Sequence, residues 1–435
     1  MTELRLVSSR GGAPAVTLSE AIASGLAPDG GLYMPTRLPR VDAAAIPDVS
    51  RLNVVARTLL GGFFEGDPLE PVLGEIADAA LELAAPTTAI AAGEGRLFAL
   101  ELYHGPTAAF KDFGARFLAE ALQRLENRQS QPLTILVATS GDTGGAVAAA
   151  FHRRPWVRVA ILYPKGMVSP RQEQQLTCWG DNVLSLRIDG TFDDCQRLVK
   201  QAFGDPALKQ RHRFSSANSI NIGRLLPQMV YYAASSLETA RHTGAKPSYI
   251  IPAGNLGNAL AAVWARSLGM PIGRIILAHN ANRAVPDYLR TGIWQPRPSI
   301  ATLASAMDVG NPSNMERMRA QFPTAQALRE QLSADSVDDA TIRARIGEDF
   351  MRYAREWCPH TATAAEVYRR LPAAERRDHP WVVVATAHPA KFNDIVEPII
   401  GKPVAIPDSL DRLLRLPSRH LDLPPTLEAL AAALE

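Results

Sequence analysis

The sequence predicts an α/β protein built on mostly parallel sheets. The same order of segments recurs along the chain: an apolar run of strand length, a glycine-rich loop, and an apolar helical segment. Leu133–Phe151 and Tyr249–Leu268 each follow this plan, and Trp381–Thr386 is a last apolar run of the same kind. Strands that alternate with helices pair in parallel through right-handed crossovers, so we expect ligands at the carboxyl ends of the strands.

The composition is that of an ordinary globular protein. The 435 residues are 46% hydrophobic and 21% charged, and the net charge is +2. Such a chain can form two or three domains. Lys and Arg are spread along it, so it lacks the basic cluster that nucleic acid or an anionic membrane would require. Its three cysteines, Cys178, Cys195 and Cys358, lack the spacing of a zinc site or a disulfide framework. We therefore expect a cytoplasmic protein that binds no metal.

Residues 1–100 form the first predicted unit, which ends at a turn, Gly93–Gly95, before the strand-like Leu97–Leu102. Within the unit, Leu26–Pro35 has the glycines and prolines of a structural loop. Much later, residues 322–372 are helical and charged, and we expect them to form a peripheral cover. The Pro-rich and Leu-rich sequence after residue 401 is expected to wrap around the domain.

The segment His104–Gly114 places Lys111 where an apolar helix is expected to begin. Pro106 is a helix-start signal, and apolar residues follow at helical spacing: Phe110, Phe113, Phe117, Ala121 and Leu125. The positive end of a helix and partial burial both disfavour an ammonium, so the pKa of Lys111 should be low and its amine free to form a Schiff base. A lysine with a packed stem and a solvated head would give the same pattern.

Two glycine-rich loops, Thr139–Gly145 and Gly254–Asn258, can each bind an anion. Both lie between a predicted strand and a predicted helix, where backbone N–H groups and the helix end favour a carboxylate or a phosphate. Neither loop has the GxGxxG spacing of a dinucleotide site. The strand after the second loop ends in His279 and Asn280 and offers no carboxylate to hold a ribose.

The span Ser215–Arg224 concentrates groups that grip a phosphate dianion, namely Ser216, Asn218, Ser219, Asn221 and Arg224. A capped helix start, with Asn221 as the cap and Arg224 in solvent, explains the same span equally well. Beyond the last strand, a Thr386 hydroxyl could face a ring nitrogen. His388 and Lys391 could be catalytic or merely packing and surface groups.

A Schiff-base lysine, two anion loops and a hydroxyl at a strand end describe a pyridoxal phosphate site. The chain resembles the threonine synthases of the bacterial and fungal type, which are fold type II pyridoxal phosphate enzymes. The resemblance covers most of residues 1–400 in order and rests on Ser8–Gly11, Gly25–Tyr33, His104–Gly114, Thr139–Gly144, Asn218–Asn221 with Arg224, Gly254–Gly257 and Thr386–Phe392.

The resemblance implies two open parallel-sheet α/β domains with an N-terminal extension domain. Residues 1–100 would form the extension, residues 101–220 the smaller α/β domain with the Schiff-base lysine and the carboxylate loop, and residues 221–435 the larger domain with the cofactor-phosphate loop. The implied cofactor-binding residues are Lys111, Gly254, Asn255, Leu256, Gly257, Asn258 and Thr386, with Lys111 also catalytic.

For the substrate, the resemblance implies a carboxylate site and a phosphate site. Ser140, Gly141 and Thr143 would hold the carboxylate, while Asn218, Ser219 and Arg224 would hold the phosphate. No cofactor role is implied for Asp142, because a carboxylate would repel the cofactor's phenolate oxygen unless it were turned away or protonated.

The leading hypothesis is a pyridoxal 5'-phosphate enzyme that converts O-phospho-L-homoserine and water to L-threonine and phosphate, as a monomer or homodimer. One alternative is a phospho-lyase that releases 2-oxobutyrate and ammonia from the same substrate. Another is a non-catalytic or nucleotide-binding Rossmann-like protein, for which the missing ribose carboxylate is unfavourable.

Overall fold

A computed structural model describes residues 4–90, 96–126 and 131–435 of the chain. The predicted turn at Gly93–Gly95 lies outside these residues. An N-terminal unit contains a two-stranded antiparallel sheet and three α-helices: β1 (Leu6–Ser8), β2 (Tyr33–Pro35), α1 (Leu18–Ser24), α2 (Leu52–Phe64) and α3 (Leu73–Leu81), with the 3-10 turns η1 (Ala43–Ala45) and η2 (Glu70–Val72).

The described strands outside this two-stranded sheet form two larger sheets. The larger sheet consists of β3 (Thr87–Ala89), β4 (Leu97–Glu101), β9 (Ser248–Pro252), β10 (Ile275–His279), β11 (Ser333–Ser336) and β12 (Trp381–Ala385). Its order is β11-β10-β9-β12-β4-β3, and β3 with β4 is its antiparallel pair. The smaller sheet consists of β5 (Leu133–Ala138), β6 (Val157–Pro164), β7 (Val183–Ile188), β8 (Arg213–Ser216) and β13 (Leu421–Leu423). Its order is β13-β7-β6-β5-β8 and its pairs are parallel, so the predicted fold class is confirmed.

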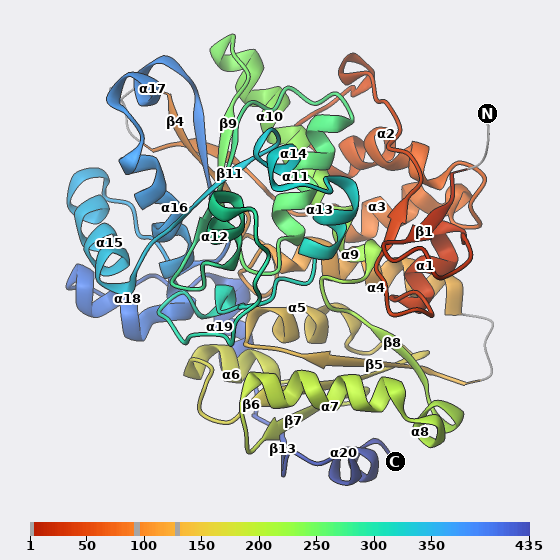
Figure 1. The fold of residues 1–435 in the computed structure, drawn as a ribbon. Helices are drawn as coiled ribbons and strands as arrows, with labels where there is room; N and C mark the ends of the chain where they lie inside the picture. Colours follow the sequence, from red (N-terminus) through yellow and green to blue (C-terminus); the bar gives the residue numbers. More distant parts are fainter. Residues whose placement is uncertain (1–3, 91–95, 127–130) are drawn as a thin grey trace.

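Helices cover both faces of each sheet, as Figure 1 shows. The smaller sheet is accompanied by α4 (Lys111–Glu126), α5 (Asp142–Phe151), α6 (Pro170–Thr177), α7 (Phe192–Gly204), α8 (Pro206–Arg211) and α20 (Leu427–Leu434). The larger sheet is accompanied by α9 (Ile222–Leu225), α10 (Gln228–Thr243), α11 (Gly257–Ser267), α12 (Ala284–Thr291), α13 (Met315–Gln321), α14 (Ala325–Arg329), α15 (Asp339–Tyr353), α16 (Pro359–Arg370), α17 (Ala373–Asp378), α18 (Asn393–Ile400) and α19 (Asp408–Leu414), with η3 (Ser305–Met307) and η4 (Pro389–Phe392).

Strand β5 illustrates why the central strands are apolar throughout. Ile135 and Val137 pack into the same core as α4 and α5, whereas Leu136 and Ala138 pack into a separate core with α7 and α20. Successive side chains of a strand point to opposite faces, so a strand with helices on both sides needs apolar residues at every position. No helix in the described part of the chain is long and apolar enough to cross a membrane.

Three strands lie outside the sheet that their position in the sequence suggests. β3 and most of β4 precede residue 101, yet they extend the larger sheet beside β12, and β13 joins the edge of the smaller sheet. The pairing of these strands therefore crosses the boundaries of the predicted ranges 1–100, 101–220 and 221–435, and the division into these three units stays a prediction. Hydrogen bonding to a spatial neighbour, not sequence order, decides where such short strands pair.

The expected peripheral cover at residues 322–372 is wrong for its last part. Helix α16 is almost entirely buried and packs against β9 and β12 in the core of the larger sheet, and β11 is the edge strand of that sheet. The charge of this region belongs mainly to α15 and to the end of α16, where Arg369 and Arg370 lie. The average charge of residues 322–372 therefore gave no indication that α16 is buried.

Candidate active site

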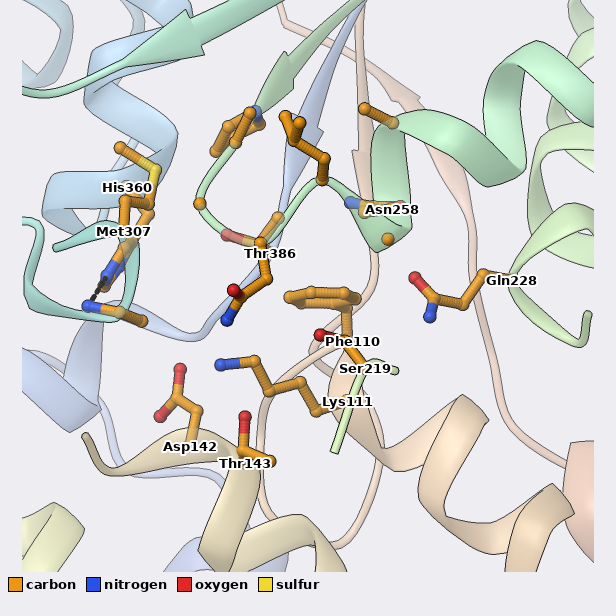
Figure 2. Close-up of a pocket in the computed structure, with 18 of the residues that line it drawn as sticks. Phe110, Lys111, Asp142, Thr143, Ser219, Gln228, Asn258, Met307, His360 and Thr386 are labelled. Atoms are coloured by element: carbon orange, nitrogen blue, oxygen red, sulfur yellow. Dashed lines mark hydrogen bonds between the residues drawn. The ribbon is translucent and has the colours of Figure 1, made fainter. Parts of the chain in front are cut away.

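The predicted cofactor residues meet in one pocket between the two α/β domains, which we call the inner pocket. The loop Ala253–Asn258 enters it after β9, Thr386 after β12, and Lys111 from the start of α4. Asp142 at the start of α5 and His360 in α16 also line it (Figure 2). Residues far apart in the sequence are thus brought together at the carboxyl ends of parallel strands, as predicted.

Lys111 is the first residue of α4. The turn before it is held by Asp112, whose carboxylate accepts hydrogen bonds from the Thr107 N–H (2.9 Å) and hydroxyl (2.7 Å). Lys111 lies deep in the molecule and is only partly exposed, because it faces the pocket. Burial lowers its pKa to about 8; the Asp142 carboxylate opposes this shift and the charge of Arg224 adds to it. The low pKa agrees with the prediction from the sequence.

Asp142 forms a buried ion pair with Lys391, with 2.8 Å between Oδ1 and Nζ. The Gln172 amide donates to the same oxygen (3.0 Å), and Lys391 also donates to the Thr107 carbonyl (2.8 Å). Burial raises the pKa of Asp142, but the charges of Lys391 and Lys111 outweigh it and hold this pKa well below its usual range. Figure 2 shows the Lys111 amine directed toward this carboxylate. The inner pocket therefore contains a carboxylate whose charge is already balanced.

His360 contributes a neutral imidazole to the inner pocket. Its Nε2 accepts a hydrogen bond from the Ala306 N–H (3.1 Å), as Figure 2 shows. Burial lowers the pKa of His360 to about 4, with the Asp142 charge opposing this shift. Because Nε2 is the acceptor, the proton of the neutral ring is assigned to Nδ1, which is buried and has no partner among the described residues.

The loop Gly254–Asn258 has the shape of an anion-binding loop. Helix α11 begins at Gly257, so the first N–H groups of the helix have no partner within it. Leu256 has a φ of +65°, a conformation that non-glycine residues rarely adopt and that is often found at functional sites. At Gly254 a Cβ atom would lie 3.1 Å from the Ala306 carbonyl oxygen, so close packing favours glycine there.

Two buried side-chain donors line the inner pocket beside this loop. Asn258 Oδ1 accepts hydrogen bonds from Tyr231 (2.5 Å) and Tyr232 (2.9 Å), and its Nδ2 has no partner among the described residues. Arg224 donates through Nη1 to the Ala217 carbonyl, and its Nε likewise has no described partner. Burial lowers the pKa of Arg224 to about 10, so it stays charged at neutral pH. The N–H groups of the loop and the Asn258 amide, with the reactive amine of Lys111, fit pyridoxal phosphate, whereas Arg224 is a cation that remains available to a second anion.

A second pocket, which we call the outer pocket, shares five residues with the inner one: Lys111, Thr143, Ser219, Asn255 and Ala306. It is larger, about 280 Å³ against about 70 Å³. Neutral polar side chains make up much of its lining: Thr139, Ser140, Ser216, Ser313, Gln196, Asn218, Asn255 and Asn311. No Asp or Glu of the described residues lines it. The outer pocket therefore suits a negatively charged ligand.

The predicted substrate residues divide between the two pockets. Ser140 and Asn218 line the outer pocket, and Thr143 and Ser219 line both. Arg224 lines the inner pocket. The three residues predicted to bind the substrate phosphate therefore lie on both sides of the boundary between the pockets.

Gly141 and Asn221 shape the site without lining either pocket. Gly141 has a φ of +131°, which favours glycine, and its N–H donates to the Thr139 hydroxyl (3.0 Å). Asn221 caps α9 by accepting a hydrogen bond from the Gly223 N–H (2.9 Å), as the capped-helix interpretation predicted. That interpretation is wrong for Arg224, which is buried and not solvated.

Arg317 connects the N-terminal unit to both pockets. It is fully buried and donates to the Tyr33 carbonyl (2.9 Å), the Ile220 carbonyl (2.5 Å) and Asn314 Oδ1 (2.6 Å). The Asn314 amide then donates to the carbonyl groups of two pocket residues, Ser219 (3.1 Å) and Asn255 (3.0 Å). A displacement of the N-terminal unit would thus be transmitted through these hydrogen bonds to the backbone of Ser219 and Asn255.

Sequence reasoning missed several residues that line or support the inner pocket: Phe110, Gln228, Met307, Arg317 and His360. Phe110 was expected on the buried face of the helix, but it precedes α4 and lines the pocket beside Lys111. For His360, the low charge of residues 358–368 was the available signal, because it marks a buried helix that can carry a functional side chain into the core.

Comparison with known proteins identifies the class. A family model described as "Pyridoxal-phosphate dependent enzyme" matches residues 81–387, which include Lys111, both glycine-rich loops and Thr386. Together with the fold and the donor set, this match makes the chain a fold type II pyridoxal phosphate-dependent enzyme. Two further models match at the ends, "Threonine synthase N terminus" at residues 5–80 and "Threonine synthase, C-terminal" at residues 361–434.

The relatives point to the same family. The threonine synthase of Escherichia coli (strain K12) is 40% identical over 418 residues, which cover 95% of each chain. The crystal structure of an Escherichia coli threonine synthase matches with a TM-score of 0.88 and 36% identity, covering 99% of each chain. A pyridoxal phosphate-bound threonine synthase from Brucella melitensis matches with a TM-score of 0.89 and 32% identity, covering 99% of this chain and 98% of that one.

The chain belongs to the threonine synthase family. The predicted family, fold class, enzyme class and cofactor are therefore confirmed, and the hypothesis of a non-catalytic nucleotide-binding protein is wrong.

Proposed function

We propose that this enzyme converts O-phospho-L-homoserine and water to L-threonine and phosphate. The observation that carries the proposal is the junction of the two pockets at Lys111. On one side lies a donor set that fits the cofactor, and on the other a cavity of neutral donors suited to an anionic substrate. A substrate with a carboxylate and a γ-phosphate needs both kinds of anion site next to the reactive amine.

Lys111 is the proposed proton carrier. Pyridoxal phosphate, when bound, would link covalently to the amine of the substrate and withdraw electrons from Cα, the carbon that bears this amine. Lys111 takes a proton from Cα of the substrate and, once it has released that proton, takes another from Cβ, and its depressed pKa suits this work near neutral pH. The Cγ–O bond breaks with its electron pair leaving on phosphate, water adds its oxygen at Cβ, and protons return to Cγ and Cα.

The pocket positions support the anion contacts that we propose. Ser140 and Thr143, with the loop shaped by Gly141, are the proposed carboxylate ligands. Asn218 and Ser219, with Arg224, are the proposed ligands of the substrate phosphate, and the N–H groups of Gly254–Asn258 those of the cofactor phosphate. Neutral donors can accept the phosphate when it arrives and release it after the bond has broken, while a charged guanidinium stabilises the leaving group.

Thr386 and Asp142 set the charge around the cofactor. A carboxylate in place of Thr386 would hold a proton on the ring nitrogen, whereas a hydroxyl leaves the ring neutral there. The Asp142 carboxylate, which by itself would repel a phenolate oxygen, is neutralised by Lys391. The ion pair thus supports a structural role for Asp142 that needs no protonation.

A product assay tests the proposal against the phospho-lyase alternative. The purified enzyme, supplied with pyridoxal phosphate, is incubated with O-phospho-L-homoserine, and threonine, 2-oxobutyrate and phosphate are quantified together. We expect threonine and phosphate in equal amounts. Phosphate accompanied by 2-oxobutyrate and no threonine would support the phospho-lyase, and the absence of all three products would refute both.

A further inference from the structure

Helix α7 forms one wall of the outer pocket, and its contribution is not explained by the residues assigned so far. One face of α7 is buried against the smaller sheet, where Cys195 and Leu198 lie in the core. A neighbouring face lines the pocket with Phe192, Gln196, Val199, Lys200 and Phe203. Gln196 and Lys200 lie four residues apart, so they are neighbours on the helix surface.

Lys200 is distinguished by the charges around it. Only two cations line the outer pocket among the described residues, Lys111 and Lys200, and no carboxylate lines it. No hydrogen bond or ion pair joins the Lys200 ammonium to another described residue. Under the proposed function Lys111 is engaged with the cofactor, which leaves Lys200 as the cation of this pocket that is available to a substrate.

The position of Arg224 makes a second cation useful. Arg224 is buried, donates to a backbone carbonyl and lines the inner pocket, whereas Asn218, a proposed phosphate ligand, lines the outer pocket. A phosphate dianion that entered the outer pocket would meet neutral hydroxyls and amides on one wall and Lys200 on α7. A flexible ammonium at an exposed wall can contact the dianion early and still allow it to leave.

We propose that Lys200 is a substrate-binding residue that contacts the phosphate of the incoming substrate and of the released product. The proposal rests on the proposed function. It assigns two cations, Lys200 and Arg224, to the substrate phosphate. Lys200 raises the affinity for the phosphorylated ligand from the open side. Arg224 acts from the buried side, on the leaving group.

An exposed lysine on a helix is commonly a solvated surface group, so the test must detect a contact that is selective for phosphate. The holoenzymes to compare are the wild type, Lys200→Met, Lys200→Arg and the matched control Lys209→Met. Lys209 is an exposed lysine in the neighbouring α8 that lines neither pocket. Three quantities are measured: the kinetics with O-phospho-L-homoserine, inhibition by inorganic phosphate, and the affinity for L-threonine from the cofactor absorbance.

For Lys200→Met we expect the KM for O-phospho-L-homoserine to rise roughly 10-fold, at the lower end of the effect of losing a hydrogen bond between charged groups, with kcat within about twofold of the wild type. The inhibition constant of phosphate should rise by a similar factor. The affinity for L-threonine should not change, because threonine has no phosphate. Lys200→Arg and Lys209→Met should stay near the wild type in all three measurements.

Two results would overturn the assignment of Lys200. One is a Lys200→Met enzyme with the KM and phosphate inhibition of the wild type. The other is an equal loss of affinity for L-threonine, since that would indicate a damaged pocket and not a lost phosphate contact. A wild-type enzyme that makes no threonine from O-phospho-L-homoserine would instead refute the proposed function itself, so the two failures are distinguishable.

Discussion

The inner and outer pockets meet at Lys111, but they handle charge differently. In the inner pocket, Asp142 is paired with Lys391 and held by Gln172, and burial keeps His360 neutral. The outer pocket has hydroxyls and amides, no carboxylate among its described lining, and an exposed lysine. The carboxylate of the inner pocket is therefore paired before any ligand arrives, whereas the outer pocket has no carboxylate among its described lining and its cations obtain a counter-charge from the ligand.

This difference matches what each pocket is proposed to hold. A cofactor that stays through many turnovers needs side chains at fixed positions, and a buried ion pair with further hydrogen bonds to Gln172 and the Thr107 carbonyl helps to fix them. A phosphate that enters on the substrate and leaves as a product needs contacts that do not bind it permanently, which neutral donors supply. The predictions below change one pocket at a time.

Replacing the shared residue should have the largest effect. Lys111→Ala removes the amine on which both pockets depend, so we expect turnover to fall at least about 1,000-fold, to the detection limit. In the wild type, borohydride reduction followed by peptide mapping should find the cofactor on Lys111. An adduct on Lys165 or Lys391 would contradict the assignment.

Arg224→Ala should impair substrate turnover while the cofactor stays bound. Removing one partner of a buried charge contact costs about 2–5 kcal/mol, which corresponds to roughly 30-fold to several thousand-fold in kcat/KM. The variant should remain yellow and lose its preference for O-phospho-L-homoserine over L-homoserine. Absorbance spectra and kinetics measure both properties.

Each other outcome for Arg224 has a definite meaning. Wild-type kcat/KM would remove Arg224 from the site. A colourless Arg224→Ala protein would instead assign the guanidinium to the cofactor phosphate, and would make it part of the permanent inner pocket. Arg224→Lys is the matched control, because it keeps the charge and loses the planar donor geometry.

The sequence was most informative where the backbone determines the site. The strands that became β5, β9 and β12 were predicted, whereas β8, which leads to Ser216 in the outer pocket, was not, and both glycine-rich loops lie where the repeated strand, loop and helix order placed them. Such loops have local signals, namely glycines between an apolar strand and an apolar helix. The predicted cofactor residues therefore line one pocket, although Lys111 and Gly254 are far apart in the chain.

The sequence was least informative where two side chains define each other's role. Lys391 alone could be a catalytic, packing or surface group, and Asp142 alone looked unfavourable beside a cofactor. Their ion pair resolves both questions, but it depends on the distance between η4 and α5, which no local pattern encodes. Arg224 shows the same limit, because helix capping by Asn221 and burial of the guanidinium occur together in one span.

Asp142→Asn should lower the free energy of unfolding, because it breaks the ion pair at the inner pocket. The change leaves the buried Lys391 ammonium without its counter-charge, which typically costs about 3–5 kcal/mol in the free energy of unfolding. Urea unfolding at pH 7 measures this loss. The double variant Asp142→Asn/Lys391→Met removes both charges and should recover most of it. A single variant as stable as the wild type would contradict the importance of the pair.

The sign of the pH dependence follows from the same ion pair. The folded-state pKa of Asp142 is lower than that of an unfolded aspartate, so its contribution to stability is present above the ordinary carboxyl range and is lost as the pH falls below it. The wild type should therefore lose more stability than the double variant does when the pH is lowered from 7 toward 3.

The smallest expected effect concerns the pH at which the cofactor attaches. Only the free amine of Lys111 can react, and burial lowers its pKa to about 8 from the ordinary value of 10.5. The rate of reconstitution of the apoenzyme should therefore rise about tenfold between pH 7 and pH 9 and level off above that. A lysine with an ordinary pKa would instead gain roughly tenfold per pH unit up to about pH 10. Stopped-flow absorbance follows the attachment, and reaction of the cofactor with a model amine corrects for the cofactor's own ionisation. A rate that is still rising tenfold per pH unit at pH 9 would mean that Lys111 is solvated in the apoenzyme, and that burial in the inner pocket does not lower its pKa.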